Sequence, residues 1–124
     1  MQSVLILRAA RLFFILGVAA IVALSLDVSG AVTAPGGDKL HHFLAYFAVS
    51  GCGFHGFGAR RTLPVFAFMI ALGAALEIAQ MTLTATRVGD SADLLADGLG
   101  VALAALCVGA LARFGGARRP ARAE

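Results

Sequence analysis

The chain has 124 residues, of which 60% are hydrophobic and 14% are charged, and its formal net charge is +3. Soluble domains carry about a quarter charged residues, so this composition argues against a water-soluble globule and against an acidic disordered chain. The ten basic residues lie between apolar runs rather than along one stripe. We therefore predict an integral membrane protein that binds no nucleic acid.

Four apolar segments follow one another along the chain, and a membrane-spanning helix needs roughly 20 such residues. The predicted spans cover residues 8–26, 40–58, 63–84 and 93–114. The sequence thus predicts an all-α fold, an integral membrane four-helix bundle that forms a single domain over residues 1–114. Residues 115–124 are expected to form a basic tail.

The first segment has a second interpretation as a cleaved signal peptide. Two arginines, Arg8 and Arg11, precede its apolar core, and Val32-Thr33-Ala34 is typical of a small-residue cleavage site. Pro35 follows directly and argues against cleavage. We favour a spanning helix whose arginines reach back to the membrane interface.

The distribution of Lys and Arg predicts the orientation, because these residues are retained in the cytoplasm. Only Lys39 and Arg87 lie on one side of the predicted bundle. The other side holds Arg8, Arg11, Arg60, Arg61, Arg113, Arg118, Arg119 and Arg122. We expect both termini in the cytoplasm, and the loops around residues 27–39 and 85–92 on the outer face of the cell (plasma or inner) membrane.

Polar residues collect at the outer end of the predicted bundle. Residues three, four and seven apart share one helix face. Three such faces are Asp38 with His42 and Tyr46, Glu77 with Gln80 and Thr84, and Asp93 with Asp97 and Gly100. Charged side chains are costly in lipid, so we expect all three faces to turn inward around a shared polar pocket.

Each of these residues also has a structural interpretation. Asp38, Asp90 and Asp93 are placed as helix-capping or first-turn acids. Lys39 is suited to anchoring a helix at the interface. Glu77 with Gln80, and Asp93 with Asp97, resist such an interpretation best. Glu77 lies inside its helix near the negative pole of the helix dipole, where a carboxylate needs a cation, a shared proton or a metal.

The polar residues together resemble the VanZ-like family of small bacterial membrane proteins. The resemblance spans about residues 38–104 and rests on Asp38-Lys39-Leu40-His41-His42-Phe43-Leu44-Ala45-Tyr46, on Glu77-x-x-Gln80, and on Arg87 with Asp93-x-x-x-Asp97-x-x-Gly100. The family pattern has a single His before the Phe, so His41 is extra, and it usually has Asn where this chain has Asp97. The resemblance implies a link to low-level resistance to glycopeptide antibiotics such as teicoplanin.

We predict that the outward-facing pocket binds or modifies an envelope lipid or a lipid-linked saccharide. Glu77 and His42 are the candidate general base and acid, and Asp93 would orient His42 or Arg87. Lys39 and Arg87 would hold an anionic head group through charge-assisted hydrogen bonds. The other candidate binding residues are Asp38, Gln80, Asp97 and Tyr46.

Two alternatives stay open at this point. In the first, the chain is a non-catalytic membrane factor whose buried polar network is structural and presents a partner-binding surface. In the second, His42 and the carboxylates hold Mg²⁺, Mn²⁺ or Zn²⁺. The favoured prediction, a lipid-binding pocket, includes no metal and no cofactor. The expected partners are a membrane lipid and a lipid-linked envelope intermediate, and assembly into a homo-oligomer is left open.

Overall fold

A computed structural model of the chain describes residues 2–26, 38–83 and 90–116. Over these ranges the chain forms α1 (Gln2–Ser25), α2 (Asp38–Phe57), the short 3₁₀ turn η1 (Ala59–Arg61), α3 (Thr62–Leu83) and α4 (Ser91–Gly116). These ranges contain no strand, which confirms the predicted all-α fold for the described part of the chain. Residues 117–124, most of the predicted basic tail, lie outside it.

Each predicted segment corresponds to one helix, although the boundaries differ. The helix α1 begins at Gln2 rather than at residue 8, and α4 begins at Ser91 rather than at residue 93. The start of α4 is fixed by Asp90, whose Oδ1 accepts a hydrogen bond from the backbone N–H of Ala92 at 2.9 Å. Asp90 is therefore the N-cap of α4, as its position predicted.

Three of the helices are long and apolar enough to cross a membrane, over Ser3–Ser25, Ala59–Leu83 and Ser91–Phe114. Their outer faces expose large apolar side chains, such as Leu5 at 63% and Leu63 at 76%. Such surfaces indicate a membrane protein, because a soluble domain rarely exposes so much contiguous apolar area. The helix α2 is not among these three, since it begins with charged residues and contains three histidines.

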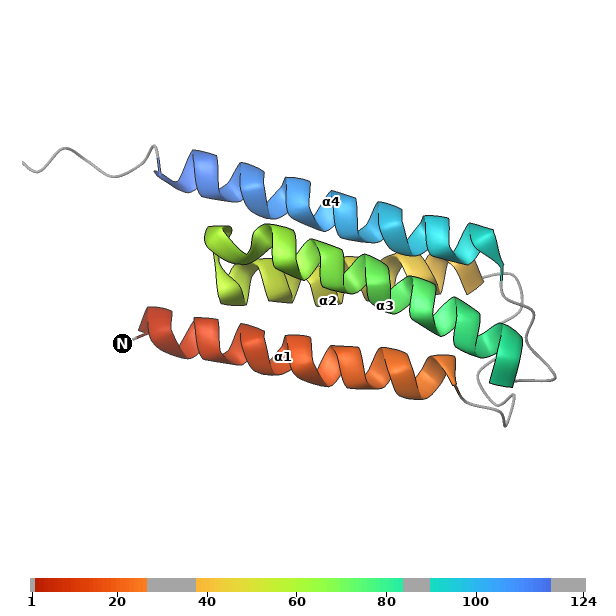
Figure 1. Cartoon of the computed structure of the whole chain (residues 1–124). Coiled ribbons are helices and arrows are strands. Elements are labelled where there is room, and N and C mark those ends of the chain that lie inside the picture. Colours follow the sequence, from red (N-terminus) through yellow and green to blue (C-terminus); the bar gives the residue numbers. More distant parts are fainter. Residues whose placement is uncertain (1, 27–37, 84–89, 117–124) are drawn as a thin grey trace, which may run out of the picture.

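The helix α2 is the central element of the bundle. Figure 1 shows α1 and α4 on opposite sides, with α2 and α3 between them, and α2 contacts each of the other three helices. Because its neighbours cover much of its surface, α2 has less need of a continuous apolar face than they do. Some polar residues of α2 therefore lie between helices, namely His42, Tyr46 and Ser50, whereas Asp38, Lys39, His41 and His55 are exposed.

Two glycines set the geometry around α2. Gly58, with φ 78°, ends α2 in a left-handed conformation that allows the short turn into α3. Gly100 of α4 lies against the backbone of α2, where a Cβ would overlap the carbonyl oxygen of Phe43 and lie 3.0 Å from the amide nitrogen of Phe47. The helices α2 and α4 thus approach each other closely because Gly100 has no side chain.

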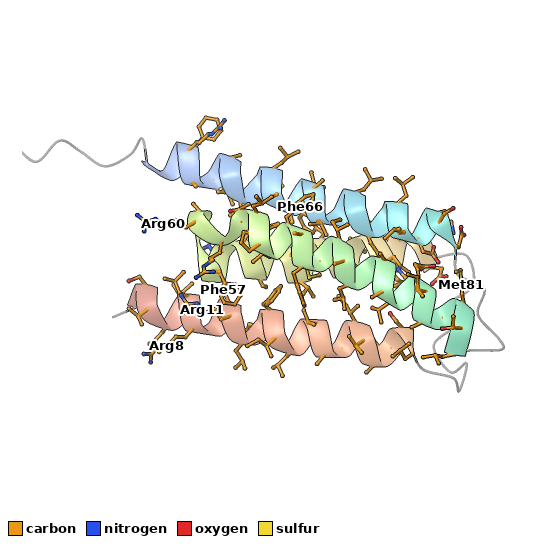
Figure 2. All side chains as sticks on the ribbon, in the orientation of Figure 1. Arg8, Arg11, Phe57, Arg60, Phe66 and Met81 are labelled. Atoms are coloured by element: carbon orange, nitrogen blue, oxygen red, sulfur yellow. The ribbon has the colours of Figure 1, made fainter. Side chains whose placement is uncertain are left out.

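The end of the bundle where α2 passes into α3 is basic, and we call it the arginine end. Figure 2 shows Arg8, Arg11 and Arg60 at this end and Met81 at the opposite end. Arg11 of α1 donates from its Nε to the carbonyl oxygen of Gly56 at 2.7 Å. Its guanidinium lies 5.6 Å from the ring centroid of Phe57, so it also makes a cation–π contact at the end of α2.

Candidate functional site

The opposite end of the bundle, which we call the acidic end, brings together the first turns of α2 and α4 and the last turns of α3. Five of the seven acidic residues of the chain lie there. They are Asp38, Glu77, Asp90, Asp93 and Asp97. Three carboxylates are buried, with exposed fractions of 9% for Glu77, 7% for Asp93 and 2% for Asp97. Buried carboxylates are costly without a partner, so the contacts of this end determine what it can do.

Lys39 joins the beginning of α2 to the beginning of α4. Its Nζ donates to Asp90 Oδ2 at 2.6 Å and to Asp93 Oδ1 at 3.1 Å. These hydrogen bonds raise the pKa of the Lys39 ammonium above its usual range, and the bond to Lys39 together with the Ala92 amide lowers the pKa of Asp90. The Lys39 and Asp90 side chains are half-exposed, so this cation can exchange its partners with a bound ligand.

His42 is held by a buried carboxylate. Its Nδ1 is hydrogen-bonded to Asp97 Oδ1 at 3.0 Å, and its Nε2 lies 3.8 Å from Asp38 Oδ1. Asp97 thus makes the orienting contact with His42, whereas Asp93 contacts Lys39. Arg87, the other residue that Asp93 was expected to orient, lies outside the described residues. The neighbouring His41 is exposed, because adjacent residues cannot share one helix face.

Asp97 also faces α3. Its Oδ2 and the hydroxyl oxygen of Tyr46 lie 2.9 Å and 3.4 Å from the place where a Cβ on Gly73 would be. Tyr46 is itself buried, with 2% of its surface exposed. The absence of a side chain at Gly73 therefore leaves room for a polar contact region among α2, α3 and α4.

Glu77 and Gln80 occupy the adjoining part of α3. The Glu77 carboxylate has the backbone of Asp90 as a hydrogen-bond partner, which connects α3 to the cap of α4. Gln80 is buried and donates from Nε2 to the carbonyl oxygen of Ser25 at 2.9 Å. Gln80 therefore connects α3 to the end of α1, in addition to its predicted place on the polar face.

Not every predicted site residue has the predicted place. Arg87 and Thr84 lie outside the described residues. The side chain of Asp38, the first residue of α2, is 66% exposed, although its Oδ1 lies 3.8 Å from Nε2 of His42 on the same face. His42 and Tyr46, one and two turns further along the same face, are covered.

The structure also reveals features that the sequence prediction did not assign to the site. The contact of Asp90 with Lys39 is one of them, although the position of Asp90 before α4 was a usable signal for it. Ser50 is another: its Oγ is fully buried and has no hydrogen-bond partner. No motif marks Ser50, so only the packing of α2 identifies it.

A separate apolar hollow of about 390 Å³ lies toward the arginine end. None of the predicted site residues lines it. Its lining consists of Phe14, Phe57, Arg61, Pro64, Val65 and Phe68. The hollow therefore belongs to the opposite end of the bundle from the polar residues.

Comparison of the chain with models of protein families, with curated proteins and with solved structures gave no match. The VanZ-like resemblance accordingly rests on the motif residues of the acidic end alone.

Proposed function

We propose that the chain is a VanZ-like, multi-pass protein of the bacterial inner membrane whose acidic end binds or modifies an envelope lipid or a lipid-linked saccharide. The observation that carries this proposal is the convergence of Lys39, His42, Glu77, Asp93 and Asp97 at one end of an otherwise apolar bundle. Intramembrane ionisable groups are rarely kept without a functional reason. A polar region at the membrane surface suits a ligand with a polar head and apolar chains.

The opposite charge of the two ends supports an outward-facing site. Arg8, Arg11 and Arg60 lie at the arginine end, and basic residues are retained in the cytoplasm. In this proposal α2 also crosses the membrane, since its 20 residues extend about 30 Å and its neighbours cover its polar face. Both termini are then cytoplasmic. A reporter enzyme active only outside the cytoplasm should stay inactive when fused to the C-terminus.

The contacts support specific chemical roles. His42, held through Nδ1 by Asp97, presents Nε2 as a proton donor or acceptor. Glu77 is a buried carboxylate close to the same helix ends, which suits a general base. Lys39 supplies an ammonium for an anionic head group, and Arg87 is proposed to supply a second cation.

The experiment compares Glu77→Gln and Asp93→Asn with wild type in a strain that depends on the protein for reduced teicoplanin susceptibility. Membrane abundance is measured by immunoblot beside the susceptibility of the same cells. Normal abundance with lost protection is the expected result. Ile78→Ala is the matched control, because Ile78 neighbours Glu77 but is 59% exposed on the outer face of α3. Full protection by both carboxylate variants would contradict the proposal.

A non-catalytic role is the alternative, and one observation favours it. Lys39 with Asp93 and His42 with Asp97 already form a paired network that fastens α2 to α4. A network of this kind is able to serve helix packing alone and to present the loops to a partner. In that case the same variants should lower abundance, and protection should fall in proportion to it.

A further inference from the structure

The acidic end has more negative charge than its described cations neutralise. Among residues 38–83 and 90–116, five carboxylates lie there against one ammonium, that of Lys39, and the imidazole of His42. Lys39 contacts Asp90 and Asp93 and leaves the other carboxylates without an ammonium partner. Without a further cation, the described side chains of this end would exert net repulsion on an anionic head group. A bound cation would remove it.

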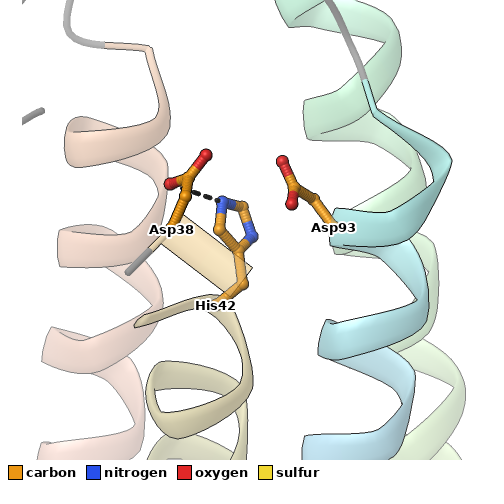
Figure 3. A group of neighbouring side chains, drawn as sticks. All are labelled: Asp38, His42 and Asp93. Carbon is orange, nitrogen blue, oxygen red and sulfur yellow. Dashed lines mark ion pairs between the residues drawn. The ribbon is translucent and has the colours of Figure 1, made fainter. Parts of the chain in front are cut away.

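Three side chains at this end are arranged as a ligand set. Asp38, His42 and Asp93 each offer one ligand atom, and these atoms all lie within 4.8 Å of one another. Figure 3 shows the three side chains converging from the first turns of α2 and α4. Ligand atoms around one Mn²⁺ or Zn²⁺ are roughly 3 Å apart, given bonds of about 2.1 Å. The exposed Asp38 side chain is able to close the remaining gap by rotation.

The position of His42 is a separate observation that points to a ligand at Nε2. Nδ1 of His42 lies 3.0 Å from Oδ1 of Asp97, which is 2% exposed, so the ring orientation is fixed from behind. The other ring nitrogen, Nε2, faces Asp38 Oδ1 at 3.8 Å, which is beyond hydrogen-bond distance. Metal-bound histidines usually have this arrangement: one ring nitrogen contacts a carboxylate, and the other binds the metal.

We propose that Asp38, His42 and Asp93 bind one divalent cation, and that Asp97 is the positioning residue for His42. One imidazole nitrogen with two carboxylates is a mixed donor set that suits Mn²⁺ or Zn²⁺. The Lys39 ammonium, 3.1 Å from Asp93, occupies part of this region and competes with the ion for Asp93. This inference rests on the proposed function and changes one role within it: with the ion on Nε2, His42 would be a ligand rather than a proton donor or acceptor. The ion would offer its open positions to an anionic oxygen of the head group.

The test uses the full chain purified in detergent, titrated with Mn²⁺ alone and, separately, with Zn²⁺ alone by calorimetry. We expect one ion per chain. Asp97→Asn should weaken binding 10- to 100-fold, as loss of an outer partner does, and His42→Ala should weaken it at least as much. His41→Ala is the matched control, because His41 is the exposed neighbour of the same residue type, and it should bind like wild type.

Asp38→Asn separates loss of ion binding from loss of folding, because the exposed Asp38 side chain can be replaced without disturbing the packing of the core. We expect it to lose at least 10-fold in affinity for the ion at unchanged helical content by circular dichroism. With Mn²⁺ bound, pulsed electron paramagnetic resonance should show coupling to an imidazole nitrogen that His42→Ala removes and His41→Ala keeps. Absence of binding by wild type, or wild-type affinity in both Asp38→Asn and His42→Ala, would overturn the proposal.

These outcomes differ from those that test the proposed function. Binding of Mn²⁺ or Zn²⁺ with full teicoplanin protection by Glu77→Gln and Asp93→Asn would retain the metal site and refute the head-group function. No ion binding, with protection lost in the carboxylate variants at normal abundance, would refute the metal site alone.

Discussion

Gly100→Ala tests whether the close approach of α2 and α4 holds the acidic end together. The new methyl would overlap the carbonyl oxygen of Phe43, which is backbone and cannot rotate away. The helices must separate by roughly 1 Å before ordinary van der Waals contact is restored. The hydrogen bond between His42 and Asp97, now 3.0 Å, would lengthen toward about 4 Å and be lost.

The expected destabilisation is about 1–3 kcal/mol from overpacking, increased by the loss of the bond to the buried Asp97. It is measured as the free energy of unfolding, from circular dichroism during titration of detergent micelles with SDS. Gly109→Ala is the control, because it lies in the same helix with no atom within 4 Å of the added Cβ. Both variants gain the higher helix propensity of Ala over Gly, which is worth up to about 1 kcal/mol, so the difference between them reports the overlap alone. Equal stability of the two variants would refute the argument.

Two further predictions concern other parts of the bundle. Arg11→Ala should lower the free energy of unfolding by about 1 kcal/mol, because it removes the hydrogen bond to Gly56 and the contact with the ring of Phe57. In the same SDS titration, Arg8→Ala should have little effect, because Arg8 is exposed. Ser50→Ala should leave stability unchanged or raise it by up to about 1 kcal/mol, because the buried Oγ has no hydrogen bond to lose. A clear loss of stability in Ser50→Ala would mean that this hydroxyl has a partner.

The helices could be predicted from the sequence because apolar runs of this length leave few alternatives. Their boundaries could not, since a helix continues through polar residues at its ends for as long as its backbone is capped. The start of α4 at Ser91 depends on the Asp90 cap, and the start of α1 at Gln2 lies among residues that precede the predicted span. The central place of α2 is a property of the assembled bundle, because α2 itself lacks the long apolar stretch that the other three helices have.

Which residues lie at the acidic end could also be predicted, because helical spacing puts them on shared faces. Which carboxylate contacts which cation or histidine could not be predicted. Asp93 and Asp97 lie one turn apart on α4, and spacing alone allows either one to meet His42. The rotation of α4 about its axis decides between them, and that rotation follows from the contact of Gly100 with Phe43. It is a tertiary effect with no local sequence signal.

The acidic end has one part held by packing and one part that is freer to rearrange. Asp97 and Gly100 are about one turn apart on α4, and their partners His42 and Phe43 are neighbours on α2, so the helix approach and the polar contact change together. At the beginning of α2, in contrast, the side chains of Asp38 and Lys39 are exposed and are held by ion pairs rather than by packing. Binding of an ion or head group should therefore move these two side chains and leave the His42–Asp97 pair in place. Since a preorganised pair costs no ordering on binding, substitutions that loosen it should weaken affinity more than their loss of direct contacts predicts.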